Sequence, residues 1–269
     1  MEMNPEHLKY MPKTPGMEPE EPEAQEVPVA VEEVVEIVEP PEVPVSAIME
    51  QEASMAPSEE GAEAPKGLKD LLEIFYFLFN PLLVPAYACL LIFTLSILHI
   101  VAPTAALPYT LTVFGATGLV PFLTIFILQK VGVVESFYMK RPGERTVPYA
   151  IDFLAFGAMA IFFVYMGANA WIWTMFCGGA AIALVNMIIN FRMRISSHCS
   201  AMAGLLAVLI VLNTYGIPQV SLFWWMVGAV FFAGVVGTAA IFVGKHTIWE
   251  VTAGYATGFL GIILFSLIH

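Results

Sequence analysis

The sequence predicts an all-α membrane protein, a polytopic bundle of about six or seven transmembrane helices that follows a disordered N-terminal tail. Hydrophobic residues make up 58% of its 269 residues. They gather in stretches near the ~20 residues that a helix needs to cross a bilayer. The acidic residues are segregated from these stretches, because residues 1–66 hold 17 of the 23 in the chain. The chain therefore divides into a tail, residues 1–66, and a membrane domain, residues 67–269.

The tail is rich in proline as well as in acid. It holds 11 of the 19 prolines, and its only basic residues are Lys9, Lys13 and Lys66. A segment of this composition cannot bury enough apolar surface to offset the entropy of the chain. We therefore expect it to be disordered, with an acidic charge that could recruit a basic protein partner. The rest of the chain has 6 acidic and 8 basic residues, a net charge of +2, so the overall −12 belongs to the tail. We expect no nucleic acid as a partner.

The apolar stretches of the membrane domain predict seven spans. They are residues 75–100, 109–129, 147–166, 169–189, 198–214, 221–243 and 247–267. Pro81 and Pro85 interrupt the first span and should kink it. Gly254 and Gly258 in the last span have the spacing of a GxxxG pair, which is typical of close helix packing in membranes.

Five of the eight cationic side chains of the membrane domain gather in three segments between spans. These are residues 140–145 after the second span, 194–198 after the fourth and 245–250 after the sixth. Two crossings separate each segment from the next, so all three should emerge on one face of the membrane. The loops expected on the other face contain no Lys or Arg. Two explanations stay open: the positive-inside rule makes this face cytoplasmic, or the cations are there because they bind phosphate.

Two histidine clusters carry the chemistry that these segments suggest. His246 and Glu250 are four residues apart and share one face of a helix. A carboxylate there can accept a hydrogen bond from one imidazole nitrogen and leave the other aimed outward as a nucleophile. His198 follows Ser196 and Ser197, which are good N-cap residues. The exposed amides and the dipole at such a helix start favour a bound phosphate.

Basic side chains that could neutralise phosphate oxygens accompany both clusters. They are Lys140, Arg141, Arg145, Arg194 and Lys245, and arginine offers paired donors. A metal site formed by His198, His246 and Glu250 is the weaker alternative, since no further ligands are evident. The three cysteines lie within or at the ends of spans and lack the spacing of a zinc site or a disulfide framework. We therefore expect no metal and no cofactor.

These residues resemble the motifs of the type 2 phosphatidic-acid phosphatase superfamily of membrane phosphatases. Its second motif reads Pro-Ser-Gly-His, and residues 195–198, Ile-Ser-Ser-His, keep the serine and the histidine. Its third motif reads Ser-Arg, five residues, His, three residues, Asp, and here Glu250 follows His246 after three residues. Its first motif reads Lys, six residues, Arg-Pro. Residues 144–148 look like a variant of it, with Arg141 and Pro142 as the other register.

The resemblance covers about residues 75–267 and implies a role for each matching residue. His246 would be the nucleophile that forms a phosphohistidine, Glu250 would orient it, and His198 would be the general acid. Arg145 and Ser196 would hold the phosphate, and the family needs no metal. The implied protein is an integral, multi-pass phosphatase of a bacterial inner membrane, acting on a lipid phosphate monoester or diphosphate.

The sequence also departs from the family motifs. The third-motif arginine would lie six residues before His246, where the chain has Ala240, and the first-motif lysine would be Tyr138, although Lys140 is close by. Losing one cationic clamp could cost a few kcal/mol of transition-state stabilisation. The departures leave open a second function, a non-catalytic protein that binds or transports a lipid phosphate. The sequence does not distinguish among phosphatidic acid, phosphatidylglycerol phosphate, undecaprenyl diphosphate and phosphorylated lipid A as the lipid.

Overall fold

The computed structural model describes residues 66–132 and 146–268, and every secondary-structure element in these residues is a helix. In chain order they are α2 (Lys66–Leu78), α3 (Val84–Leu95), α4 (Leu98–Val101), α5 (Ala106–Phe114), the π-helix η2 (Gly115–Leu119), α6 (Val120–Lys130), α7 (Thr146–Tyr165), α8 (Ala170–Ile189), α9 (Ser197–Tyr215), α10 (Phe223–Phe242) and α11 (Ile248–Ser266). Six helices are long and apolar enough to cross a membrane, with α5, η2 and α6 forming one of them. The predicted all-α, multi-pass fold is therefore confirmed. The tail before residue 66 lies outside the described residues.

The first predicted span, residues 75–100, is wrong as a single helix, because a turn separates α2 from α3. Pro81 explains the break, since it has no N–H and disfavours a helical backbone at Asn80 before it. Asn80 Oδ1 instead accepts a hydrogen bond of 3.0 Å from the Leu82 amide. With 12 residues, α3 is about 18 Å long, which is short of the ~30 Å hydrocarbon core of a bilayer.

The other six predicted spans match the long helices, with ends that differ by at most three residues. One irregularity among them was not predicted, the π-helical turn η2 between α5 and α6. Pro121 follows this turn and has no N–H to donate to the carbonyl of Thr117, so the regular α-helical ladder cannot continue there. The helix nevertheless continues as one span of 25 residues, Ala106–Lys130.

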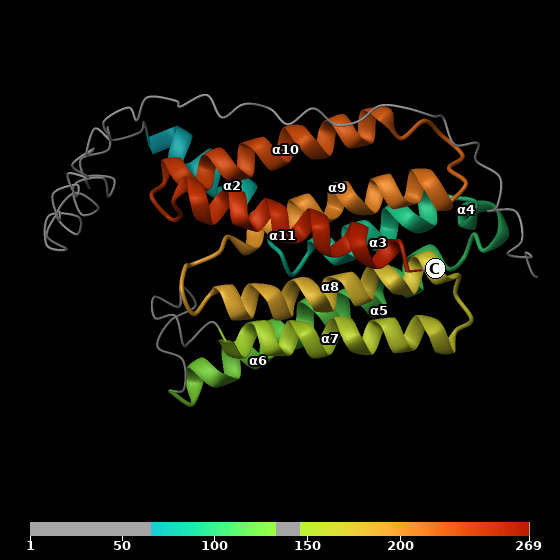
Figure 1. The fold of residues 1–269 in the computed structure, drawn as a ribbon, viewed down its shortest axis with the longest axis horizontal. Helices are drawn as coiled ribbons and strands as arrows, with labels where there is room; N and C mark the ends of the chain where they lie inside the picture. The colour runs from blue at the N-terminus through green and yellow to red at the C-terminus, as the bar shows by residue number, and fades with distance from the viewer. Residues whose placement is uncertain (1–65, 133–145, 269) are drawn as a thin grey trace, which may run out of the picture. The chain divides into compact units, whose positions relative to one another are not determined.

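α9 is the central helix of the membrane domain. It packs against α11, α10, α3 and α8 (Figure 1), and it is the most buried of the six spans. Polar side chains tie it to its neighbours inside the bundle. Ser200 Oγ on α9 donates to the carbonyl of Gly254 on α11 at 2.9 Å, and Asn186 Nδ2 on α8 donates to Ser200 Oγ at 3.0 Å. These bonds fix how far α11 and α8 can slide along α9.

Gly254 and Gly258 bring the backbones of α11 and α9 into contact, as their spacing predicts. A methyl group at Gly254 would lie 2.6 Å from the carbonyl oxygen of Ser196. One at Gly258 would overlap the carbonyl oxygen of Ser200. Since backbone atoms cannot rotate away as a side chain can, neither position accommodates a larger residue without moving the helices apart.

Replacing Gly258 with alanine should therefore destabilise the protein by about 1–3 kcal/mol or more, the usual cost of overpacking. The matched control is Gly234→Ala on α10, where an added methyl group meets no atom within 4 Å. This control should be neutral or slightly stabilising, because alanine has the higher helix propensity. Thermal unfolding of both purified variants in detergent measures the difference. Equal midpoints for Gly258→Ala and wild type would contradict the packing described for α9 and α11.

The first turns of α7, α9 and α11 lie at the same end of the bundle (Figure 1). The Tyr149 hydroxyl on α7 lies 2.9 Å from Ser197 Oγ at the start of α9. The Ser196 amide donates to the carbonyl of Glu250 in α11 at 3.3 Å. The predicted common face thus holds for residues 194–198 and 245–250. Residues 140–145 lie outside the described residues, although α7 begins directly after them.

Candidate active site

A cavity of about 580 Å³ lies at this end, between the α2–α3 turn, α6, the starts of α7 and α9, and the loop before α11. Five of the residues singled out from the sequence line it: Arg194, Ser197, His198, Lys245 and His246. They come from two segments about fifty residues apart in the chain, residues 194–198 at the start of α9 and residues 245–246 before α11. The structure therefore brings both histidines and two cations to one cavity.

Glu250 and Ser196, which the sequence also singled out, do not line this cavity. Glu250 is buried behind His246. Ser196 is fully buried and does not line the cavity, because its hydroxyl caps α9 by accepting from the Cys199 amide at 3.5 Å. Lys140, Arg141 and Arg145 lie outside the described residues.

A glycine turn sets the position of His246. Gly244 follows α10 with φ +69°, in the left-handed region that favours glycine. The turn directs the amides of Lys245 and His246 back to the carbonyl of Ala240, at 3.0 and 3.1 Å. A glycine just after an apolar span is a recognised signal for a helix end, and this signal could have located the turn. The turn places His246 next to the start of α9.

The ring of His246 is held through one nitrogen. Its Nδ1 lies 3.0 Å from Glu250 Oε2 and 2.9 Å from the backbone carbonyl oxygen of Arg194. Both of these oxygens are acceptors, so Nδ1 carries the hydrogen. In the neutral ring the lone pair then belongs to Nε2, which is the nitrogen required of a nucleophile. Spacing predicted the contact with Glu250, and the Arg194 carbonyl was not predicted.

Glu250 is itself fixed by its helix. Its Oε2 accepts from the Thr247 amide at 3.1 Å, while its own amide donates to Thr247 Oγ1 at 3.3 Å. These reciprocal bonds form a capping box at the start of α11. The Arg194 guanidinium also lies near, with Nε 3.8 Å from Glu250 Oε1. A carboxylate held in this way can orient His246 without moving.

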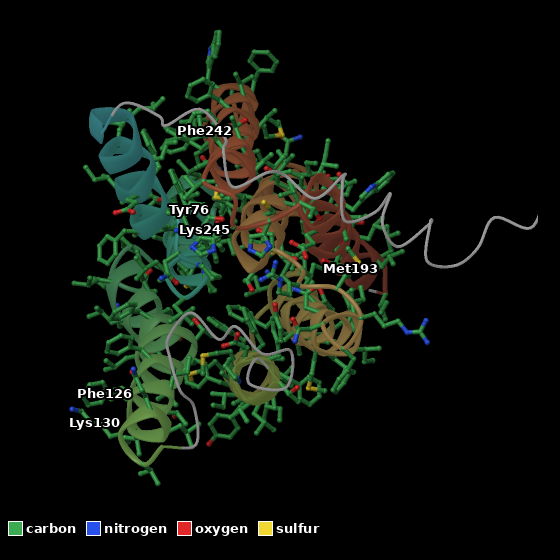
Figure 2. The ribbon with its side chains drawn as sticks, turned by 90° about the vertical axis from the view of Figure 1, so that its left-hand side faces the viewer. Tyr76, Phe126, Lys130, Met193, Phe242 and Lys245 are labelled. Carbon is green, nitrogen blue, oxygen red and sulfur yellow. The ribbon has the colours of Figure 1, made fainter. Side chains whose placement is uncertain are left out.

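Tyr76 joins the two histidine clusters and was not predicted. Its ring centroid lies 4.1 Å from that of His198, and Lys245 Nζ lies 4.5 Å from the Tyr76 ring centroid. Figure 2 shows Lys245 beside Tyr76 at the end of α2. Burial raises the pKa of the Tyr76 hydroxyl above its ordinary value, so the hydroxyl stays neutral. In the sequence, the only feature that could have indicated a role for Tyr76 is its position shortly before the helix break at Pro81.

Two further polar side chains on α7 line the cavity. Tyr149 is buried and reaches Ser197, and Asp152 follows it by three residues on the same face of the helix. The sequence gave no reason to place Tyr149 at the site, apart from its hydroxyl within an otherwise apolar span. Asp152 stands out in the sequence as a charge inside a span, and the role expected from this signal was pairing with a cation of the three segments rather than direct catalysis.

The arrangement has the parts needed to bind and attack an anionic group. It offers the start of α9, two cations, an oriented imidazole and a second imidazole on the same cavity. Among the described residues, no group of three or more His, Cys, Asp or Glu side chains is placed to hold a metal ion.

Comparison of the chain with protein-family models, with curated proteins and with solved structures gave no match.

Proposed function

We propose that the chain is an integral membrane phosphatase that hydrolyses a lipid phosphate monoester or diphosphate through a phosphohistidine at His246. The observation that carries this proposal is the geometry of His246. Its Nδ1 is bound by Glu250 and by the Arg194 carbonyl, beside a cavity that also holds His198 and Lys245. The resemblance of these residues to the motifs of the type 2 phosphatidic-acid phosphatase superfamily supports it. A bacterial inner membrane, which carries such lipids, is the proposed location.

The proposed reaction has two steps. Nε2 of His246 attacks phosphorus, the P–O bond to the lipid alcohol breaks, and His198 gives its proton to the leaving oxygen. Water then attacks the phosphohistidine, His198 takes a proton from it, and the P–N bond breaks to release inorganic phosphate. Arg194 and Lys245 offset the negative charge of the phosphoryl oxygens. Glu250 stabilises the cationic ring of His246 during the first step.

The walls of the cavity favour a lipid as the carrier of the phosphate. Its lining combines the cations Arg194 and Lys245 with the apolar side chains of Phe77 and Phe122. These two side chains are 76% and 45% exposed, and each lies among other exposed apolar side chains of its helix. In a bilayer such surfaces face hydrocarbon. A substrate can therefore keep its chain in the bilayer while its phosphate reaches the histidines.

The experiment that tests the proposal is a phosphate-release assay with the purified protein in detergent, using a panel of lipid phosphates and diphosphates. We expect release of inorganic phosphate from at least one lipid, without added metal and with inhibition by orthovanadate. Release from none of them would overturn the proposal and favour the second candidate.

The second candidate is a protein that binds a lipid phosphate without hydrolysing it. Ala240 favours it, because this residue stands at the position of the third-motif arginine and is fully buried at the end of α10. The alanine side chain at this position offers neither a positive charge nor a hydrogen-bond donor to a phosphate. Saturable binding of a lipid phosphate with no release of phosphate would support this candidate.

Replacing Glu250 with glutamine should lower kcat by about 10²-fold or more, yet leave more activity than loss of the histidine itself. The amide oxygen can still accept from His246 Nδ1 and from the Thr247 amide, but it stabilises the imidazolium less well, and the NH2 group in place of Oε1 cannot accept from Arg194 Nε. KM should change little, because Glu250 lies behind the ring. Steady-state kinetics with a short-chain lipid phosphate measure both constants. The matched control is Glu73→Gln, an exposed carboxylate on α2, and equal kcat values for the two variants would contradict the role of Glu250.

A further inference from the structure

A second cavity of about 120 Å³ adjoins the one that holds the histidines. It lies between α3, α7, α8 and α9, and its lining is almost entirely apolar. Four residues line both cavities: Pro81, Tyr149, Asp152 and Ser197. They mark the passage between a polar chamber and an apolar one.

Asp152 is the feature of this passage that packing does not explain. It is the only Asp, Glu, Lys or Arg of α7, within a helix that is otherwise apolar and able to span a membrane. A charged side chain at membrane depth costs several kcal/mol unless it faces a polar cavity or a partner. Among the described residues, its carboxylate forms no ion pair and no hydrogen bond. In the described structure, the two cavities that Asp152 lines therefore explain why a charged residue is present within this apolar helix.

The charge of Asp152 limits what it can bind. A carboxylate repels a phosphate, so its ligand is a neighbouring hydrogen-bond donor on the substrate. Tyr149, three residues earlier on the same face of α7, bonds Ser197 next to His198. Asp152 thus lies one helical turn deeper than the group that contacts the start of α9. A donor one or two carbons away from the phosphate would reach it.

The apolar cavity accommodates the part of the substrate beyond this donor. At about 120 Å³ it suits the first part of one hydrocarbon chain and is too small for two. From the histidines inward, the order is cations, then a carboxylate, then a narrow apolar space.

We propose, resting on the phosphatase function above, that Asp152 is a specificity-determining residue. The geometry selects single-chain lipid phosphates that carry a hydroxyl or an ammonium group close to the phosphate. Asp152 accepts a hydrogen bond from this group, while the chain enters the apolar cavity. A site built around a buried acceptor discriminates strongly against an analogue that lacks the donor, since the acceptor is then left desolvated and unpaired.

The test compares four substrates with one chain of twelve or more carbons. They are dodecyl phosphate, 1-dodecanoyl-glycerol 3-phosphate with its free 2-hydroxyl, the 2-O-methyl ether of that compound, and a sphingoid base phosphate that bears an ammonium group. In the wild type, kcat/KM should be about 10- to 100-fold higher with the hydroxyl than with the methyl ether. Asp152→Leu should remove this preference, lowering kcat/KM for the donor substrates far more than for dodecyl phosphate. Asp152→Asn should retain more activity on the hydroxyl substrate than on the ammonium one, because the amide oxygen still accepts a hydrogen bond but carries no charge.

The outcomes separate this proposal from the phosphatase function. Hydrolysis of none of the four substrates, nor of any lipid phosphate in the panel, would overturn the phosphatase function and this proposal with it. Equal wild-type kcat/KM for the hydroxyl compound and its methyl ether would overturn the role of Asp152 alone, and this result does not depend on whether any variant folds. Loss of activity by the same factor on all four substrates in a folded Asp152→Leu protein would also overturn it, since a merely structural residue would behave in that way.

Discussion

Replacing His246 with alanine should reduce phosphate release to the uncatalysed background, a loss of about 10⁶-fold if the residue is the nucleophile. Among the described side chains that line the cavity, His246 is the one whose ring is held by both a carboxylate and a backbone carbonyl, which leaves Nε2 to attack phosphorus. The alanine leaves the capping box of α11 intact, because that motif uses Thr247 and Glu250. The loss should therefore occur in a folded protein.

The matched control is His99→Ala, an exposed histidine on α4 that does not line the cavity. Initial rates of phosphate release from the preferred lipid, normalised to folded protein by size-exclusion chromatography, measure both variants. Full activity in His246→Ala would remove the proposed mechanism altogether. Equal losses in His246→Ala and His99→Ala would show that the assay reports stability rather than chemistry.

Replacing His198 with alanine should lower kcat for an alkyl phosphate by about 10²–10⁴-fold, the usual contribution of a general acid. The leaving alkoxide then departs without its proton. An aryl phosphate such as 4-nitrophenyl phosphate needs no such proton, so its hydrolysis should be partly rescued. The ratio of the two rates in wild type and variant measures the effect. The same loss with both esters would exclude a general acid and leave His198 a binding or packing residue beside Tyr76.

Hydropathy sufficed for the six long helices because each is a continuous apolar stretch near the length of a bilayer crossing. It failed for residues 75–100, where local backbone chemistry prevails. Pro81 breaks the helix although most residues around it are apolar, and Asn80 closes a turn instead. The π-helical turn before Pro121 was missed for the same reason. The Gly254 and Gly258 contact was predicted because a fixed spacing on one helix is enough to place both glycines on one face.

The site was predictable to the extent that it depends on spacing and on sidedness. His246 and Glu250 meet because they are four residues apart, and His198 joins them because an even number of crossings separates the two loops. Tyr76 and the Arg194 carbonyl could not be predicted. Their positions depend on how α2 and the start of α9 pack against the loop before α11, which no local pattern encodes.

The most direct test of the account is to trap the covalent intermediate. The wild-type protein is mixed with a lipid phosphate labelled at phosphorus, quenched in alkali within milliseconds to seconds, and digested for mass spectrometry. A phosphoramidate survives alkali and is lost in acid, so it can be told from a phosphoester. The account predicts an acid-labile phosphoryl group on His246, present in wild type and absent from His246→Ala. Rapid release of phosphate with no label on His246 at any quench time would contradict it.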